Sequence, residues 1–166
     1  MFEIKLIPHK DILESELNEV ISLKSKQWGF GINEQKQWIE KNLNNNDLHL
    51  ILKENDLGVA YLNLIDINLY LNDKQIKGFG VGNVCAIERG KGYGFKIMKE
   101  ANKIISDLDR IGLLFCKEPL VKYYKSLDWL ELNDGKFEIN LKNTHCLFFN
   151  IQNYRDLKLS YDGLIF

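Results

Sequence analysis

The sequence contains few of the residues on which several classes of protein depend. Three of its 166 residues are Arg, and 22 basic residues stand against 23 acidic ones, for a net charge of −1. Without a basic excess there is no general attraction to nucleic acid, because that attraction comes from the release of counterions around phosphates. The apolar runs are a handful of residues long, against the ~20 needed to span a bilayer. Glu3 and Lys5 also interrupt the stretch where a signal peptide would carry its apolar segment. We therefore expect no nucleic-acid partner and no membrane partner.

Cysteine and histidine are also scarce. Cys85, Cys116 and Cys146 form an odd set without a C-x-x-C pair, which argues against a disulfide framework and against a zinc site. Each lies in an apolar stretch, so we expect three small buried side chains. The three His residues show no spacing typical of metal ligands. The composition predicts no metal and a reducing, cytoplasmic location.

The length predicts one domain over residues 1–166, since ~100–200 residues usually make one. Strands are predicted at residues 2–7, 48–53, 58–70, 76–87, 111–116, 137–141 and 144–151. Helices are predicted at residues 11–26, from an N-cap at Asn33 through Leu43, at 97–108, and from Pro119 to Leu127. The pattern beyond Gln152 predicts no element. This order indicates an α/β (α+β) fold with a mixed, partly parallel central sheet flanked by helices.

Two of the predicted elements have unusual features. The strand at 76–87 contains Gly78, Gly80 and Gly82, and glycines inside a strand mark bulges or the close approach of another backbone. In the last helix, Leu120, Tyr124 and Leu127 are predicted to share one buried face.

The segment from Val84 to Phe95 carries the sharpest functional signal. It reads V-C-A-I-E-R-G-K-G-Y-G-F, a strand followed by a glycine-rich turn and the start of the clearest helix. A helix N-terminus has unpaired N–H groups and a partial positive charge, and glycines let a ligand approach that backbone closely. The pattern therefore predicts an anion site suited to phosphate. The alternative is a tight connection between strand and helix that merely needs glycines.

The spacing excludes two common phosphate-binding motifs. A P-loop needs G-x-x-x-x-G-K-[ST], but Cys85 occupies its first glycine position and Gly92 follows Lys91. A dinucleotide fingerprint G-x-G-x-x-G fails because Phe95 or Ile97 occupies its third glycine position. A nucleotide-binding domain is accordingly a poor third interpretation of the chain. The pattern that is present is R-x-x-G-x-G.

This pattern, formed by Arg89, Gly92 and Gly94, resembles the pyrophosphate-binding motif of the GNAT superfamily of N-acetyltransferases. That motif, R/Q-x-x-G-x-G/A, joins a central strand to a long helix. Residues 112–116 and 120–129 are similar to the family's next strand and helix, which end in F-Y-x-x-L-G-F/W, and are similar to aminoglycoside-type acetyltransferases in particular. The two motifs cover residues 76–130. Two departures are a shorter approach to Arg89, without the family's usual Pro, and Asp128 in place of a Gly.

The resemblance implies a GNAT fold, acetyl-CoA as cosubstrate and a set of residues that bind it. Pantetheine would lie in a gap between the strands at 76–87 and 111–116. The backbone that would pair with it belongs to Val84, Cys85, Ala86 and Ile87. The pyrophosphate would be held by the amides of Gly90, Lys91, Gly92, Tyr93, Gly94 and Phe95. Arg89 and Lys91 would add positive charge, the alternative being two solvated surface cations.

The resemblance also implies catalytic roles. Tyr124 matches the family's Tyr that protonates the departing CoA thiolate, although it also suits a core position. Asp66, at the end of a strand, and Glu88, beside the motif, are candidates for the general base, and each also suits an ordinary polar position. Trp28, Phe30 and Trp38 lie where the family places the substrate-side wall, and core packing explains them equally well.

The resulting expectation is an enzyme, an acetyl-CoA-dependent N-acetyltransferase that acts on a primary amine of a small molecule or peptide by direct attack. The alternative from another class is a non-catalytic acyl-CoA-binding module of the same fold, used for sensing or assembly. The sequence identifies neither the amine substrate nor the oligomeric state, and a homodimer is among the states that it allows.

Overall fold

The computed structural model describes residues 1–131, 137–139, 141, 143–152 and 158–166. Within them, the α-helices are α1 (Glu14–Gln27), α2 (Ile32–Asn42), α3 (Tyr93–Asp107) and α4 (Glu118–Lys125), with a short 3₁₀ turn at His9–Asp11. The first five strands are β1 (Phe2–Pro8), β2 (Leu48–Glu54), β3 (Leu57–Leu71), β4 (Lys74–Ala86) and β5 (Ile111–Cys116). The later strands are β6 (Leu130–Glu131), β7 (Phe137–Glu138), β8 (His145–Phe149) and β9 (Leu159–Ser160).

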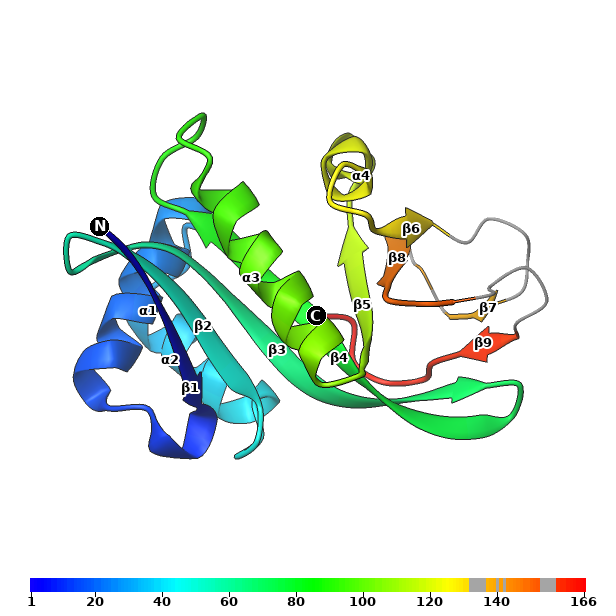
Figure 1. The fold of residues 1–166 in the computed structure, drawn as a ribbon. Coiled ribbons are helices and arrows are strands. Elements are labelled where there is room, and N and C mark those ends of the chain that lie inside the picture. Colours follow the sequence, from blue (N-terminus) through cyan, green and yellow to red (C-terminus); the bar gives the residue numbers. More distant parts are fainter. Residues whose placement is uncertain (132–136, 140, 142, 153–157) are drawn as a thin grey trace. The chain divides into compact units, whose positions relative to one another are not determined.

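The strands form a mixed sheet in which adjacent strands are mostly antiparallel. The order is β1-β2-β3-β4-β5-β8-β6, and β9 pairs with both β3 and β7 (Figure 1). The β4–β5 and β7–β9 pairs are parallel. The chain connects β4 to β5 through α3, as a parallel pair requires a crossover. The predicted mixed, partly parallel sheet flanked by helices is therefore confirmed.

The chain divides into two compact units. The first unit comprises Met1–Ile65 and Gly82–Ala101, and the second comprises Asp66–Val81 and Asn102–Phe166. The long elements β3, β4 and α3 each have residues in both units.

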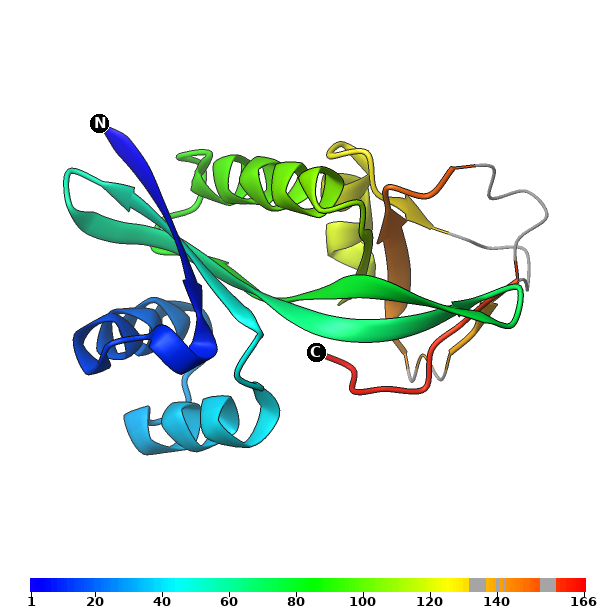
Figure 2. The ribbon, with the colours of Figure 1, turned by 60° about the horizontal axis from the view of Figure 1, so that its bottom comes forward.

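The first unit has helices on both faces of its strands (Figure 2). On one face, α1 is tied to β1 by the ion pair between Lys5 and Glu16, whose charged atoms lie 3.2 Å apart. On the other face, the ring of Phe2 packs edge-on against Tyr93 at the start of α3. This alternation follows from the pleat, because neighbouring residues of a strand face opposite sides. The core between the layers is aliphatic, with fully buried Val20, Ile39, Leu50, Leu62 and Ile97.

The second unit is built around the parallel β4–β5 ladder, which runs from Gly78 opposite Ile111 to Val81 opposite Leu114. A Cβ on Gly78 would lie 2.8 Å from the carbonyl oxygen of Ile111, and one on Gly80 would overlap the ring of Phe166. The predicted close approach of another backbone is therefore confirmed at Gly78, whereas the close neighbour of Gly80 is a side chain.

Several predicted boundaries are confirmed, including β5, which begins and ends at the expected residues. The positive φ angles of Asn72 and Asp73 mark the predicted turn between β3 and β4. The first helix begins at Glu14 rather than residue 11, because His9–Asp11 forms a separate turn. Residue 140 of the predicted strand at 137–141 lies outside the described residues.

Two predictions about the helices were wrong. Asn33 is not the N-cap of α2. Gly31 is the N-cap, and its N–H donates to the carboxylate of Glu34 at 3.2 Å. Leu120 is not on the buried face of α4: it is 47 % exposed, and Val121 is buried with Tyr124 instead. Because α4 has only eight residues, a one-residue error in the predicted buried face is enough to select Leu120 in place of Val121.

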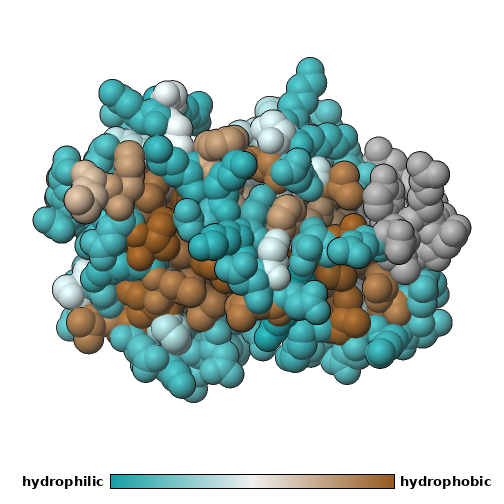
Figure 3. All heavy atoms as spheres, in the orientation of Figure 1, coloured by the Kyte–Doolittle hydropathy of each residue, from teal (hydrophilic) through white to brown (hydrophobic). Residues whose placement is uncertain are grey.

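Some large apolar side chains are exposed, including Phe30 and Ile32 at the connection between α1 and α2. On the face that Figure 3 shows, hydrophilic side chains lie between areas of apolar ones. No helix in the described part of the chain is long and apolar enough to cross a membrane.

Candidate functional site

The connection between β4 and α3 has a backbone that only glycine adopts readily. Gly90 has φ +81° and Gly92 has φ +75°, both in the left-handed region. A Cβ built on either residue would meet nothing within 4 Å. A side chain at these positions would therefore meet no steric obstacle. Glycine is favoured there because of the left-handed backbone conformation. The predicted glycine turn is present, and it leaves open room beside it.

The first turn of α3 is open to an anion. The N–H of Lys96 donates to the carbonyl of Gly92 at 3.0 Å, which makes Gly92 the residue that precedes the helix. The N–H groups of Tyr93, Gly94 and Phe95 consequently have no acceptor within the helix. Their partial positive charge is reinforced by the helix dipole.

The other α-helices begin differently. Each carries an acidic residue in its first turn, whereas α3 carries none. In α1 and α2 the carboxylates of Glu16 and Glu34 accept N–H bonds at the start of their own helices. The first turn of α3 therefore lacks the acidic side chain that the other helices place beside their N-terminal amides.

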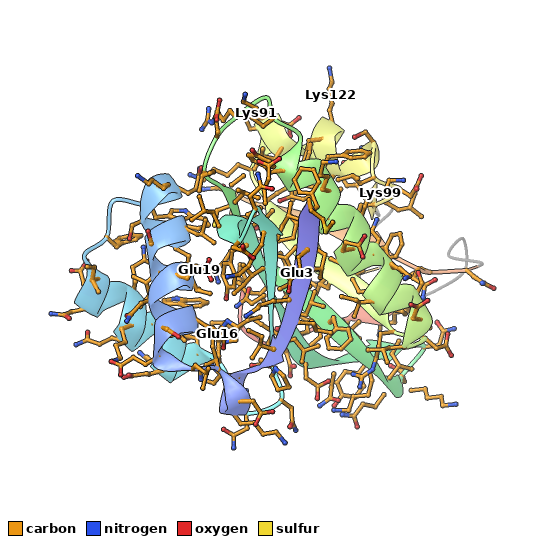
Figure 4. The ribbon with its side chains drawn as sticks, turned by 60° about the vertical axis from the view of Figure 1, so that its left-hand side comes forward. Glu3, Glu16, Glu19, Lys91, Lys99 and Lys122 are labelled. Carbon is orange, nitrogen blue, oxygen red and sulfur yellow. The ribbon has the colours of Figure 1, made fainter. Side chains whose placement is uncertain are left out.

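Charged side chains line the loop before α3. Lys91 lies in this loop (Figure 4), where its ammonium is 3.7 Å from the carboxylate of Glu88. Both side chains are more than half exposed, and Arg89 is exposed as well. An exposed pair of this kind contributes little energy, so Lys91 can exchange Glu88 for another anion at small cost. The structure brings Glu88, Arg89 and Lys91 together with the glycine turn.

The side chain of Tyr93 holds the start of α3 in place. Its hydroxyl donates to the carboxylate of Glu54 at 2.6 Å, and this hydrogen bond raises the pKa of Tyr93. Its ring packs against Phe2, whose other neighbour is the ammonium of Lys96 at 4.4 Å from the ring centroid. This anchoring role was missed in the sequence, where Tyr93 was considered only for its backbone amide.

The end of β4 has an irregular backbone. Asn83 has φ +54° inside the strand, as at a bulge. The N–H of Ile87 donates to the carbonyl of Val59 in β3 at 3.0 Å, so this amide is already used within the sheet. Amides point alternately to the two sides of a strand, which directs the amide of Ala86 away from β3. Cys85 is buried, and burial raises the pKa of its thiol to about 12.

Tyr124 lies on α4 and is buried. Its ring meets that of Tyr123 edge-on, with centroids 4.9 Å apart. Burial, with smaller effects from Tyr123 and Cys116, raises the pKa of Tyr124 well above its usual value, so the hydroxyl keeps its proton. Asp128 has φ +67°, the left-handed conformation that a glycine would favour. The turn after α4 therefore persists although Asp replaces the usual Gly.

Asp66 lies in the second unit, in a cluster of opposite charges. Its carboxylate accepts a bond from Arg110 at 2.7 Å and lies 3.4 Å from the ammonium of Lys77. The guanidinium of Arg110 also stacks on the ring of Phe79 at 4.8 Å. Asp66 and Tyr124 belong to the second unit, and the glycine turn with Glu88 belongs to the first.

No protein-family model matches the sequence, and no curated protein does. Among solved structures, an acyl-CoA N-acyltransferase from Pseudomonas aeruginosa is similar, with a TM-score of 0.66 and 18% identity over 90% of this chain and 99% of that one. Escherichia coli ElaA is similar with a TM-score of 0.66 and 17% identity, over 90% of this chain and 99% of ElaA. A GCN5-related N-acetyltransferase from Kribbella flavida has a TM-score of 0.58 and 16% identity, over 78% of this chain and 33% of that one. The chain therefore has the fold of the GCN5-related N-acetyltransferases, the GNAT fold.

Proposed function

We propose that the protein is an N-acetyltransferase that transfers the acetyl group of acetyl-CoA to a primary amine of a small molecule or peptide. The observation that carries the proposal is the open N-terminus of α3 behind the left-handed Gly90 and Gly92, on a chain with the GNAT fold. This arrangement offers several N–H donors and no carboxylate, which suits a pyrophosphate. The named neighbours act on acyl-CoA or as acetyltransferases, which supports the same cosubstrate here.

The pyrophosphate of acetyl-CoA would be held by backbone from Gly90 to Phe95. The amides of Tyr93, Gly94 and Phe95 would donate, and Arg89 and Lys91 would supply charge from the side. The pantetheine arm would pair with β4. Because the amide of Ile87 serves Val59, the backbone of Val84 and Ala86 is the better candidate for this pairing.

The reaction would be a direct transfer. The amine nitrogen attacks the thioester carbonyl, a C–N bond forms, the C–S bond breaks and CoA leaves as a thiolate. We assign Tyr124 as the group whose hydroxyl protonates that thiolate, and its raised pKa keeps the proton available until the sulfur becomes basic. Cys85 and Cys116 take no part as nucleophiles, because burial raises the pKa of their thiols to about 12 and about 11.

Asp66 and Glu88 are the two candidate bases for the proton that the amine loses. To act as the base, Asp66 would have to give up its ion pairs with Arg110 and Lys77, whereas the ion pair of Glu88 is with an exposed Lys91. Asp66→Asn and Glu88→Gln separate the candidates. A base lost by substitution lowers kcat by about 10²–10⁴-fold. Asp66→Asn also lowers stability, because Arg110 loses its partner.

The binding experiment compares two matched glycine variants. Gly92→Asp places a carboxylate where the pyrophosphate would lie, and Gly29→Asp makes the same change at an exposed glycine with open space around it. Calorimetric titration with CoA should show an affinity loss of at least about tenfold, or 1.4 kcal/mol, in Gly92→Asp alone. Unchanged CoA affinity in a folded Gly92→Asp protein contradicts the assignment.

The activity experiment measures free thiol released from acetyl-CoA in the presence of a panel of primary amines and short peptides. Release that depends on the amine supports the enzyme. CoA binding without release for any amine would instead support the non-catalytic acyl-CoA-binding module.

A further inference from the structure

A group of polar side chains, four of them buried and one half-buried, lies on the face of the first unit that α1 and α2 cover. We call it the Lys24 ring, and its members are Lys24, His49, Asn63, Asn83 and Cys85. Lys24 is 3% exposed and Asn63 is 0% exposed, and His49 and Cys85 are also buried. The ring draws one residue from α1, one from β2, one from β3 and two from β4.

The members of the ring are neighbours of one another. His49 and Asn63 are directly opposite in the β2–β3 register, so their side chains share a face. The amide of Asn83 donates to the side-chain oxygen of Asn63 at 3.3 Å. The charge of Lys24 acts on both His49 and Cys85. It lowers the pKa of the His49 imidazole, as burial also does. It lowers the pKa of the Cys85 thiol as well, against the larger effect of burial, which raises it.

This ring has an excess of donors. Among the described residues, no carboxylate lies within ion-pair distance of the Lys24 ammonium, which instead lies 4.4 Å from the centroid of the Trp38 ring. The side-chain nitrogen of Asn63 is buried and has no hydrogen-bond partner. His49 offers nothing to either group, because its two nitrogens bond to His9 at 3.0 Å and to Tyr61 at 2.9 Å.

The nearby carboxylates on α1 are already engaged. Figure 4 shows Glu16 and Glu19 on α1, where it faces the strands. Glu16 binds Lys5 at 3.2 Å, and Glu19 binds Lys53 at 2.9 Å. Among the described residues, the positive charge of Lys24 therefore has the face of the Trp38 ring beside it but no carboxylate partner.

A buried cation and a buried unpaired amide both cost free energy until an acceptor reaches them. Burial lowers the pKa of Lys24 to about 8, so the side chain is still mostly charged at neutral pH. One positive charge with one amide donor matches a single negative charge. A carboxylate fits this, whereas a phosphate monoester carries about −1.5 to −2. Asn83 and Trp38 are only half-buried, so the group is not sealed from solvent on all sides.

We infer that the Lys24 ring binds the carboxylate of the acceptor substrate, so that the amines acetylated are amino acids rather than simple alkylamines. This inference rests on the proposed acetyltransferase function. The Lys24 ammonium would pair with one carboxylate oxygen, and the side-chain N–H of Asn63 would donate to the same group. Lys24 and Asn63 are specificity-determining residues in this scheme and take no part in the transfer.

The test compares amino acids with their own carboxamides as acceptors. The members of each pair have the same side chain, and the carboxamide lacks the negative charge of the carboxylate. With acetyl-CoA saturating, thiol release should show a KM for the amino acid about 10- to 100-fold below that of its carboxamide. Lys24→Met should abolish this preference and leave the affinity for CoA unchanged. Lys26→Met, an exposed lysine on the same helix, is the matched control and should keep the preference.

A second variant covers the outcome that Lys24→Met does not fold. Asn63→Asp puts a carboxylate into the ring itself, which should pair with Lys24 and abolish the preference for amino acids. Carboxamides accepted as well as amino acids by the parent protein, or a preference that survives in Asn63→Asp, overturns the inference while the acetyltransferase function stands. No thiol release with any amine contradicts the proposed function instead.

Discussion

The hydroxyl of Tyr93, the first residue of α3, donates to the carboxylate of Glu54, the last residue of β2, at 2.6 Å. The bond fixes the end of the helix whose amides would hold the pyrophosphate. Positioning of this kind matters because the donors must meet the ligand with little further ordering.

Tyr93→Phe keeps the ring on Phe2 and removes only this hydrogen bond. Because the acceptor is charged, we expect the free energy of unfolding to fall, with CoA affinity reduced several-fold. Tyr70→Phe, at an exposed tyrosine, is the control and should change neither. Urea unfolding and calorimetry with CoA measure the two effects. Equal CoA affinity in Tyr93→Phe and the parent would show that the anchor does not serve the site.

The neighbouring residues Tyr123 and Tyr124 allow a matched comparison. Tyr124→Phe should lower kcat by about one to four orders of magnitude, with little change in KM for acetyl-CoA, because it removes the proton for the thiolate. The hydroxyl of Tyr123 is buried without a hydrogen-bond partner. Tyr123→Phe should therefore leave kcat unchanged and leave stability equal or higher by about 1 kcal/mol. Steady-state kinetics on both variants, with melting temperatures, decide this. A large kcat loss in Tyr123→Phe instead would move the proton donor to the adjacent residue.

Asp128 adopts the left-handed conformation of the turn after α4. Asp128→Gly relieves this strain, and we expect a gain of up to about 1 kcal/mol in the free energy of unfolding. The control is Asp107→Gly at the end of α3, an aspartate without a positive φ, where no strain is relieved and we expect no such gain. Urea unfolding curves measure both changes. A loss of stability in Asp128→Gly would mean that the carboxylate makes a contribution larger than the strain.

Local patterns in the sequence were sufficient to predict much of the fold and, in the candidate site, the glycine turn before α3. The glycine turn was predicted because the left-handed conformations of Gly90 and Gly92 require a residue type that is visible in the sequence. The strand at Ile111–Cys116 was predicted because a short, fully apolar run has few other stable arrangements.

Contacts between distant residues could not be predicted in this way. Arg110 binds Asp66 from 44 positions away, and no local pattern marks either residue as the partner of the other. Lys24 is a second example, because the other polar groups around its buried side chain come from β2, β3 and β4. The lack of a carboxylate beside it only became visible once the strands were assembled.

His49 makes the stability of the first unit sensitive to acid. Burial, with the nearby charges of His9 and Lys24, lowers the pKa of His49 to about 4. In the unfolded chain the same group has a pKa of ~6.5, so between these values the unfolded chain binds a proton that the folded chain does not. The stabilisation is complete above pH ~6.5 and is lost as the pH falls toward 4.

We expect this one group to reduce the free energy of unfolding by about 2 kcal/mol between pH 7 and pH 5. His49→Gln keeps a side chain that can bond to Tyr61 and does not titrate, so the fall between these two pH values should shrink by that amount. His145→Gln, which changes a histidine of the second unit paired with Glu131, is the control and should retain the fall. Urea unfolding of the three proteins at both pH values measures the difference. An equal fall in His49→Gln and the parent would mean that other groups cause the acid sensitivity.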